Sequence, residues 1–423
     1  MIRWRIAILV SAAIALSYLD RQTLPVAVQA ISRDIPLTNS QFSTLQSAFL
    51  FSYAFMYIGG GKLVDALNTR LSFTLIMVFW SLACASHGLA VTFSMLAASR
   101  LLLGMGEGGG FPAATRVVAE WFPTNERATA MGIINGGTAI GAIAAPPLIA
   151  VILIYTNWRL IFFVTGALGL LWTLWWRRVY FPPGEHPALT GAERAKIEAG
   201  VALPGATESR RLRWMELLRI RETWGLVAAK TLSDGAGYFY LFWLPKYLFD
   251  ARGFNIKAVG ATAGIPHVAA GIGCLLGGWF SSYLLRRRYS LDVARKVALG
   301  LSAAVMPFIM LVPHVPVFWA IVIFSVALFG QQSWSTLVMV LPTDLFPTNV
   351  VGTVAGLVGF GGAMGGVAFG ELAGYLLDHG FGYRVVFDIA GTFHVIALLV
   401  IVLAVPRVQR LDIDSRLGYQ GAR

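Results

Sequence analysis

Charged residues are scarce in this chain of 423 residues, where Asp, Glu, Lys and Arg together make up only 13%. A soluble domain carries about twice that fraction. Cysteine is almost absent too: Cys84 and Cys274 are the only two, and no spacing suggests a disulfide framework or a metal site. No nucleotide-binding glycine loop or nucleophile elbow stands in a suitable context. We therefore expect neither an enzyme nor a bound cofactor or metal.

Long apolar stretches dominate instead, because 57% of the residues are hydrophobic and the mean hydropathy is +0.69. About 20 apolar residues suffice for a helix to cross a bilayer. We predict an all-α membrane protein with about twelve transmembrane helices. The predicted spans are 6–28, 41–62, 71–91, 95–117, 128–152, 158–178, 223–249, 257–285, 293–312, 316–340, 351–376 and 384–405.

The net charge is +12, and the basic residues responsible for it are concentrated in alternate loops between the predicted spans. Basic residues cluster at Arg3 and Arg5, in the middle interval, after the eighth span and after the last span, whereas the loop 88–94 has almost none. The positive-inside rule then places both termini and the middle loop in the cytoplasm. This distribution argues against nucleic-acid binding, and the basic loops are candidates for contacts with anionic lipid headgroups.

An internal repeat divides the chain into two halves. Trp121-Phe122-Pro123-Thr124-Asn125 and Leu345-Phe346-Pro347-Thr348-Asn349 lie 224 positions apart, and each precedes a glycine-rich helix. We expect two six-helix halves of the same topology, 1–180 and 222–406, joined by a cytoplasmic linker, 181–221, and followed by a tail, 407–423. Glycine stripes in both copies suit closely packed helices, either static or sliding against each other.

Polar residues inside the first span are the strongest functional signal. Tyr18, Asp20 and Arg21 stand where the chain should cross lipid, and charge at that depth persists mainly where it faces a bundle interior or a water-filled cavity. Such a cluster indicates that the protein binds something polar within the membrane, which is typical of a transporter.

At this point the chain resembles the major facilitator superfamily over nearly its whole length. Gly61, Asp65 and Arg70 match the superfamily's cytoplasmic loop motif between helices two and three, although Ala66 and Asn68 depart from it. Within the superfamily the chain is most similar to anion:cation symporters, and especially to hexuronate and aldonate transporters. The similar segments include 18–21, 100–112, 120–123, 145–148, 163–169, 240–248 and 341–347.

The resemblance implies proton-coupled symport of a sugar acid anion in a bacterial inner membrane, by a monomer. Arg21 is the candidate for the substrate carboxylate, because a guanidinium forms a planar fork that matches a carboxylate. Tyr18 and Tyr53 are candidate substrate contacts. Asp20 and Glu107 are candidate proton carriers, and Arg100 is a supporting charge. We expect Glu107 to face Arg21, since Arg100 stands two helical turns away from it.

A purely structural ion-pair network of Arg21 with Asp20 or Glu107 is the alternative. The second half should provide hydroxyl, amide and aromatic contacts for a polyhydroxylated substrate. The candidates are Tyr238, Tyr240, Gln331, Gln332, Trp334 and Ser335. Lys230 and Asp234 are spaced to neutralise each other. Trp243 and Tyr247 are interpreted as anchors at the membrane–water interface.

The leading hypothesis is therefore a secondary active transporter that carries a sugar acid together with a proton by alternating access. Three rivals stay open: transport of an aromatic or dicarboxylic acid, drug efflux, and a membrane sensor that binds its ligand without moving it. Which sugar acid is carried, and with how many protons, does not follow from the sequence.

Overall fold

The computed structural model describes residues 2–122, 124–191, 194, 197, 214–346 and 348–411. Within these ranges the side chains at 58, 60–66, 124, 125, 127, 128, 214, 215, 348 and 349 are not described. The described residues form helices joined by short turns and loops, with no β-strand among them. The predicted all-α fold is confirmed.

The described residues belong to two compact units. Unit 1 comprises Met1–Thr207 and Phe242–Gly264, and unit 2 comprises Glu208–Leu241 and Ile265–Arg423. One long helix, α10 (Arg221–Asp250), contributes residues to both units. The halves, linker and tail expected at 1–180, 181–221, 222–406 and 407–423 stay predictions about organisation.

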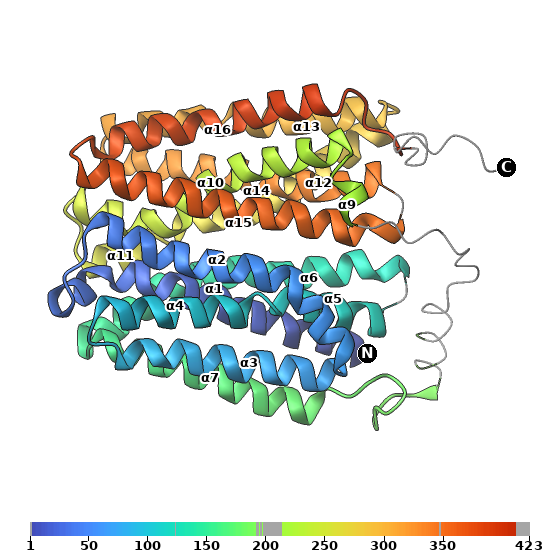
Figure 1. Ribbon diagram of the computed structural model, residues 1–423, viewed down its shortest axis with the longest axis horizontal. Helices are drawn as coiled ribbons and strands as arrows, with labels where there is room; N and C mark the ends of the chain where they lie inside the picture. Colours follow the sequence, from blue (N-terminus) through green and yellow to red (C-terminus); the bar gives the residue numbers. More distant parts are fainter. Residues whose placement is uncertain are drawn as a thin grey trace. The chain divides into compact units, whose positions relative to one another are not determined.

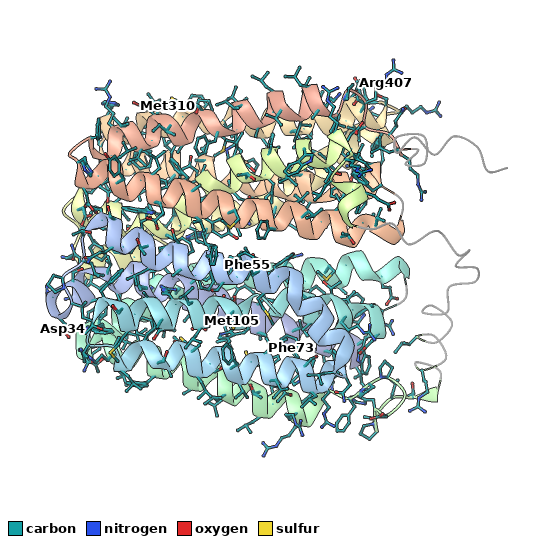
Figure 2. The ribbon with its side chains drawn as sticks, viewed as in Figure 1. Asp34, Phe55, Phe73, Met105, Met310 and Arg407 are labelled. Carbon is teal, nitrogen blue, oxygen red and sulfur yellow. The ribbon has the colours of Figure 1, made fainter. Side chains whose placement is uncertain are left out.

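Within unit 1 the long helices run roughly along one common direction (Figure 1). They are α1 (Ile2–Asp34), α2 (Asn39–Ala66), α3 (Thr69–Ser86), α4 (Phe93–Glu107), α5 (Gly110–Trp121), α6 (Thr124–Tyr155) and α7 (Trp158–Val179), with a 3-10 turn, η1 (His87–Leu89), after α3. At one end α1 is fastened to α7, because Asp34 accepts hydrogen bonds from Trp158 and Arg159. Figure 2 labels Asp34 at that end.

The described helices of unit 2 start with α9 (Trp214–Leu217) and the first part of α10. The later helices are α12 (Ile265–Arg286), α13 (Leu291–Ala304), the 3-10 helix η2 (Met306–His314), α14 (Val317–Leu345), α15 (Thr348–Asp378) and α16 (Gly382–Ala404). The short helix α11 (Ile256–Thr262) precedes them and belongs to unit 1.

Each predicted membrane span coincides with one helix or with two consecutive helices. Among the described residues, nine helical segments are long and apolar enough to cross a bilayer by length and composition. The second, fourth and seventh predicted spans are not among these nine. The fourth is divided at Gly108 and Gly109, which separate α4 from α5. This break places Glu107 at the last residue of α4.

Local capping explains where several helices begin. Asn68 accepts a hydrogen bond from the Leu71 amide at 2.8 Å at the start of α3, and Ser290 accepts one from the Val293 amide at 3.3 Å at the start of α13. These side chains satisfy backbone N–H groups that have no partner within the first helical turn.

Glycines let the repeated helices approach their neighbours closely. A Cβ at Gly137 would lie 2.2 Å from the Ser11 carbonyl oxygen, and one at Gly365 would lie 1.9 Å from the Thr231 carbonyl oxygen. The first contact joins α6 to α1 in unit 1, and the second joins α15 to α10 in unit 2. The close approach expected from the glycine stripes is confirmed at these positions, because only glycine fits where backbones meet at this distance; at Gly132, Gly136 and Gly356 a Cβ would meet nothing within 4 Å.

Candidate functional site

Arg21 lies in the middle of α1 and is almost completely buried, with 1% of its surface exposed. Its Nε donates to Oε2 of Glu107 over 2.8 Å, which confirms the expected pairing. The Ser17 hydroxyl donates to the same oxygen over 2.6 Å. One carboxylate oxygen of Glu107 thus accepts two hydrogen bonds, and a buried pair needs such additional bonds to offset its loss of hydration.

Aromatic rings surround the Arg21 guanidinium. Its central carbon lies 4.6 Å from the centre of the Tyr18 ring, 4.7 Å from that of Tyr53 and 5.2 Å from that of Phe49. A guanidinium over aromatic faces gains cation–π attraction, which is stronger away from water. The rings hold the positive charge in an apolar enclosure.

Asp20 is buried beside Arg21 in sequence but occupies a different environment. The Trp80 indole N–H donates to its Oδ2 over 2.7 Å, and the Cys84 thiol donates to its Oδ1 over 3.4 Å. Both donors are neutral and come from α3. Of the two ion-pair partners that the sequence left open for Arg21, the structure selects Glu107.

Arg100 is a buried guanidinium with unused hydrogen-bonding capacity. It is 0% exposed, and its Nε, Nη1 and Nη2 have no hydrogen-bond partner within the part of the chain that the structure describes. Glu107 stands two turns further along α4 and turns its Oε2 to Arg21 instead. Arg100 and Glu107 therefore do not pair directly, as expected from their separation of two helical turns.

In unit 2 Lys230 and Asp234 form the ion pair that their spacing predicted. The Lys230 ammonium lies 3.0 Å from Oδ1 of Asp234 and donates to the Ser335 hydroxyl over 2.7 Å. On α15, Gly362 makes room for the carboxylate, since a Cβ there would lie 2.3 Å from Oδ2 of Asp234. Ser335 therefore contacts the lysine, while its predicted role towards substrate stays a prediction.

The other candidates of unit 2 lie on α10 and α14. Gln331 is buried against Gly237, and its Oε1 has no hydrogen-bond partner among the described residues. The same holds for the fully buried hydroxyl of Tyr240. Tyr238 and Gln332 are partly exposed. Two buried polar groups on facing helices leave hydrogen-bonding capacity inside unit 2.

Trp334 has a different position from the other candidates. Its ring is 0% exposed in the apolar core of unit 2 and packs edge-on against His394, with ring centres 5.5 Å apart. Its predicted contact with substrate stays a prediction.

Comparison with known proteins settles the family. Residues 10–370 match the model of the Major Facilitator Superfamily. The chain belongs to this superfamily. It is 30% identical over 408 residues to the hexuronate transporter of Escherichia coli strain K12, covering 95% of this chain and 93% of the relative.

Two further relatives of this chain are also transporters. The galacturonate transporter of Dickeya chrysanthemi is 32% identical over 309 residues, covering 72% of this chain and 89% of the relative. The D-galactonate transporter of Escherichia coli O6:H1 is 28% identical over 417 residues, 97% of each chain. The protein is thus an integral membrane protein of a transporter family, and not an enzyme.

A solved structure shows the same fold. The crystal structure of a bacterial homologue of the human lysosomal transporter Spinster, inward-facing and occupied, superposes with a TM-score of 0.75 at 18% identity, covering 96% of this chain and 97% of that chain. At this identity the likeness shows the major facilitator fold alone.

The superfamily loop motif is described only in part. The side chains of Gly61 and Asp65 lie outside the described residues. Arg70 stacks on Phe181, 4.0 Å from the ring centre, and donates to the Arg177 carbonyl. Arg70, at the start of α3, therefore contacts both the last turn of α7 and the chain just after it.

Two acidic residues that precede the repeated Phe-Pro-Thr-Asn segments occupy matching positions. Glu120 in unit 1 accepts from the Thr69 hydroxyl over 2.6 Å and from the Tyr180 hydroxyl over 2.6 Å. Burial, together with this carboxylate, raises the pKa of the Tyr180 hydroxyl well above its ordinary value, so the hydroxyl stays a donor. The sequence analysis assigns no role to Glu120 or to its counterpart Asp344, although the two acids lie 224 positions apart in the repeat.

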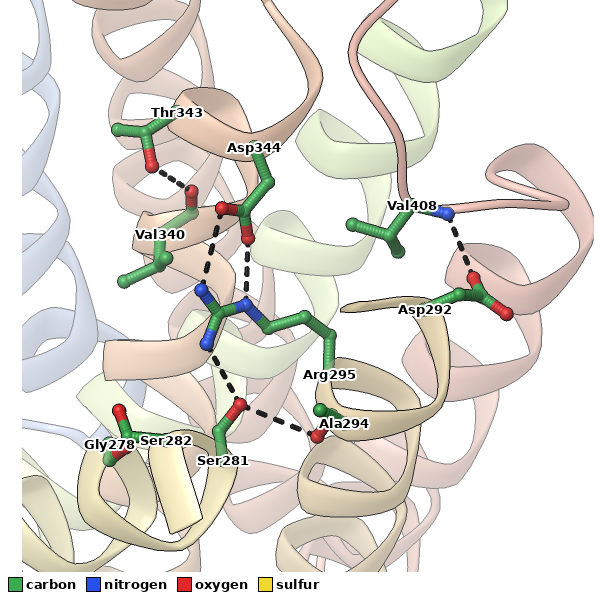
Figure 3. A network of polar contacts seen from close by, with 10 residues as sticks. All are labelled: Gly278, Ser281, Ser282, Asp292, Ala294, Arg295, Val340, Thr343, Asp344 and Val408. Atoms are coloured by element: carbon green, nitrogen blue, oxygen red, sulfur yellow. Dashed lines mark hydrogen bonds and ion pairs between the residues drawn. The ribbon is translucent and has the colours of Figure 1, made fainter. Parts of the chain in front are cut away.

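The second acid, Asp344, forms the network in Figure 3. Arg295 on α13 donates to both of its carboxylate oxygens, over 2.7 and 3.4 Å, and to the Ser281 hydroxyl over 2.8 Å. Nearby, Asp292 accepts from the Val408 amide over 2.8 Å, which holds the segment after α16 against α13.

Sequence reasoning also missed Ser17, Trp80 and Cys84. Ser17 stands one helical turn before Arg21, which is a usable signal once Arg21 is suspected. Trp80 and Cys84 are also one turn apart, so they share a face of α3. For Cys84 the sequence excludes only a disulfide framework and a metal site, because spacing within α3 cannot show which residue of α1 it faces.

Proposed function

We propose that this protein carries a sugar acid anion across the bacterial inner membrane together with a proton. The observation that carries the proposal is the buried pair of Arg21 and Glu107, whose facing atoms are 2.8 Å apart. A substrate carboxylate and the Glu107 carboxylate would compete for the same guanidinium. Protonation of Glu107 removes the competitor, so proton and anion bind together.

The class of substrate is proposed from two sources. Three relatives are named as transporters of hexuronate, galacturonate and D-galactonate, all monocarboxylate sugar acids, and two of 27% and 28% identity as probable transporters of the dicarboxylate sugar acids galactarate and D-glucarate. The chain also has the chemistry that such an anion needs: a guanidinium in an aromatic enclosure for the carboxylate, and unsatisfied amide and hydroxyl groups in unit 2 for hydroxyls. These features support a hydrophilic anion over an apolar drug.

Transport would proceed by alternating access, in which proton and anion binding shift the population between conformations open to opposite sides of the membrane. The ion pair between Arg21 and Glu107 would exist in the unloaded protein and open when both ligands bind. We further propose that both termini lie in the cytoplasm, since basic residues flank the first and last spans, and that the protein works as a monomer, as the family resemblance implies.

Uptake into liposomes tests this proposal. The purified protein is reconstituted, and labelled glucuronate is added with and without an inward proton gradient. We expect accumulation above the equilibrium level only with the gradient, with competition by galacturonate or galactonate. Uptake that never exceeds equilibrium under a proton gradient contradicts proton coupling, and specific binding without any flux supports the sensor instead.

A further inference from the structure

Two neutral groups, the Trp80 indole and the Cys84 thiol, contact the Asp20 carboxylate, and only the thiol can also accept a hydrogen bond. The Trp80 indole nitrogen lies 2.7 Å from Oδ2 and the Cys84 sulfur lies 3.4 Å from Oδ1. All three residues are buried, with exposures of 2% for Asp20, 1% for Trp80 and 0% for Cys84. The two oxygens of one carboxylate therefore face different chemistry.

The indole N–H is a donor only, so it fits an acceptor oxygen and opposes a proton on Oδ2. A thiol both donates and accepts. When Asp20 is ionised, the Cys84 S–H donates to Oδ1. When Asp20 carries a proton on Oδ1, that O–H donates to the sulfur, and the S–H must turn to another acceptor.

The required acceptor is present on α7. The Thr165 hydroxyl oxygen lies 3.1 Å from the Cys84 sulfur, in a contact where either atom can donate, and its own O–H reaches the Phe162 carbonyl over 3.4 Å. In the protonated state the order becomes Asp20 to Cys84, Cys84 to Thr165, and Thr165 to Phe162. Every polar hydrogen keeps an acceptor, and only Asp20 has gained a proton.

We infer that Trp80 and Cys84 direct a proton to Oδ1 of Asp20, and that the Cys84–Thr165 hydrogen bond reverses when the proton binds. Trp80 and Cys84 are positioning residues and Thr165 is the partner that makes the reversal possible. The proton stays on Asp20 throughout. The inference deepens the proposed function, because it rests on Asp20 as a proton site of the transport cycle.

The indole is held in place by the glycine-rich end of α4. A Cβ at Gly106 would lie 2.7 Å from the Cβ of Trp80, so only glycine permits this approach. The charged groups that act on Asp20 are Glu107 and Arg100, both from α4, while Arg21, the next residue of α1, pairs with Glu107 instead. None of the three donates a hydrogen bond to Asp20 in the described part of the chain. The Thr165 side chain also hydrogen-bonds to Asp20, and Trp80 and Cys84 each contact one particular oxygen, so these two select the oxygen.

The pH dependence of Trp80→Phe tests which oxygen is protonated, and Thr165→Val tests the reversal of the hydrogen bond. The readout is the pH at which proton-promoted substrate binding is half-maximal. Trp80→Phe removes a donor to the ionised form, so we expect the midpoint to rise by about one pH unit. Thr165→Val removes the acceptor that the protonated form needs and also the hydrogen bond that Thr165 gives to ionised Asp20, so its readout is the S–H band of Cys84: the shift of this band with pH should be lost in Thr165→Val and restored in Thr165→Ser. A lowered or unshifted midpoint in folded Trp80→Phe, or an unaltered band shift in folded Thr165→Val, overturns the inference.

The infrared S–H stretch of Cys84 gives a readout that does not depend on transport. Cys274 in unit 2 is the only other thiol, so Cys274→Ser leaves a single band and serves as the control for folding and uptake. We expect this band to shift during a pH titration, and to stay constant in Cys274→Ser with Asp20→Asn. A constant band in the Asp20 protein overturns the reversal. If the native chain shows no proton-driven accumulation while the band still shifts, the proposed function fails and the hydrogen-bond reversal stands.

Discussion

Replacing Arg21 by lysine keeps the positive charge and removes the planar fork. The native guanidinium donates from Nε to Glu107 over 2.8 Å and lies within 5 Å of the Tyr18 and Tyr53 ring centres. In the loaded protein the guanidinium would turn this fork to the substrate carboxylate; losing one hydrogen bond to that carboxylate costs about 1.5–3 kcal/mol, and weaker contact with each of the two rings costs about 0.5 kcal/mol. Together the loss is about 2.5–4 kcal/mol, which corresponds to roughly 60- to 700-fold weaker substrate binding.

Equilibrium binding of labelled glucuronate to purified Arg21→Lys measures this effect, and substrate exchange in liposomes without a gradient provides a second readout. Arg116→Lys is the matched control, because the Arg116 side chain is 48% exposed and pairs with Glu120 on the protein surface. The control should bind and exchange like the native protein. If Arg21→Lys binds substrate within threefold of native, Arg21 is not the carboxylate site and the reasoning is wrong.

Three further predictions follow from single contacts. Glu107→Gln should keep substrate exchange but lose gradient-driven accumulation, since Arg21 no longer faces a titratable partner; persistent accumulation would remove Glu107 from the coupling. Gly104→Ala should lower the yield and the thermal stability, because its Cβ would lie 2.1 Å from the Phe49 carbonyl oxygen. Gly136→Ala is the control: a Cβ there would meet nothing within 4 Å, so yield and stability should not change. Asp344→Ala should destabilise unit 2 by about 2 kcal/mol, because it leaves Arg295 without its carboxylate partner. The midpoint of thermal unfolding should fall; an unchanged midpoint would show that this ion pair adds no stability.

The membrane spans and the repeat could be predicted because they depend on local composition. Apolar runs fix where helices cross lipid, and the 224-residue offset of the repeat relates Gly141 to Gly365, each of which would place a Cβ within about 2 Å of a backbone carbonyl oxygen on a neighbouring helix. The break of the fourth span at Gly108 was not predicted. Glycine inside an apolar run permits either a continuous helix or a break, and packing against other helices decides between them.

Part of the candidate site was also accessible from sequence. Chemistry and spacing paired Arg21 with Glu107, which the structure confirms. The partners of Asp20 were inaccessible, because contacts between α1 and α3 depend on how the helices rotate about their axes. The interpretation of Trp243 and Tyr247 as interfacial anchors was wrong: both are 2% exposed. An aromatic residue near a span end has the same sequence signature whether it faces headgroups or packs on another helix.

The most direct measurement of the central claim is proton movement caused by substrate. Proteoliposomes are prepared without any gradient in a weakly buffered medium, glucuronate or galactonate is added outside, and the external pH is recorded. The account predicts that the medium becomes more alkaline as the anion enters, and that Glu107→Gln abolishes this change. Substrate uptake with no change in external pH would contradict proton coupling at the Arg21–Glu107 pair.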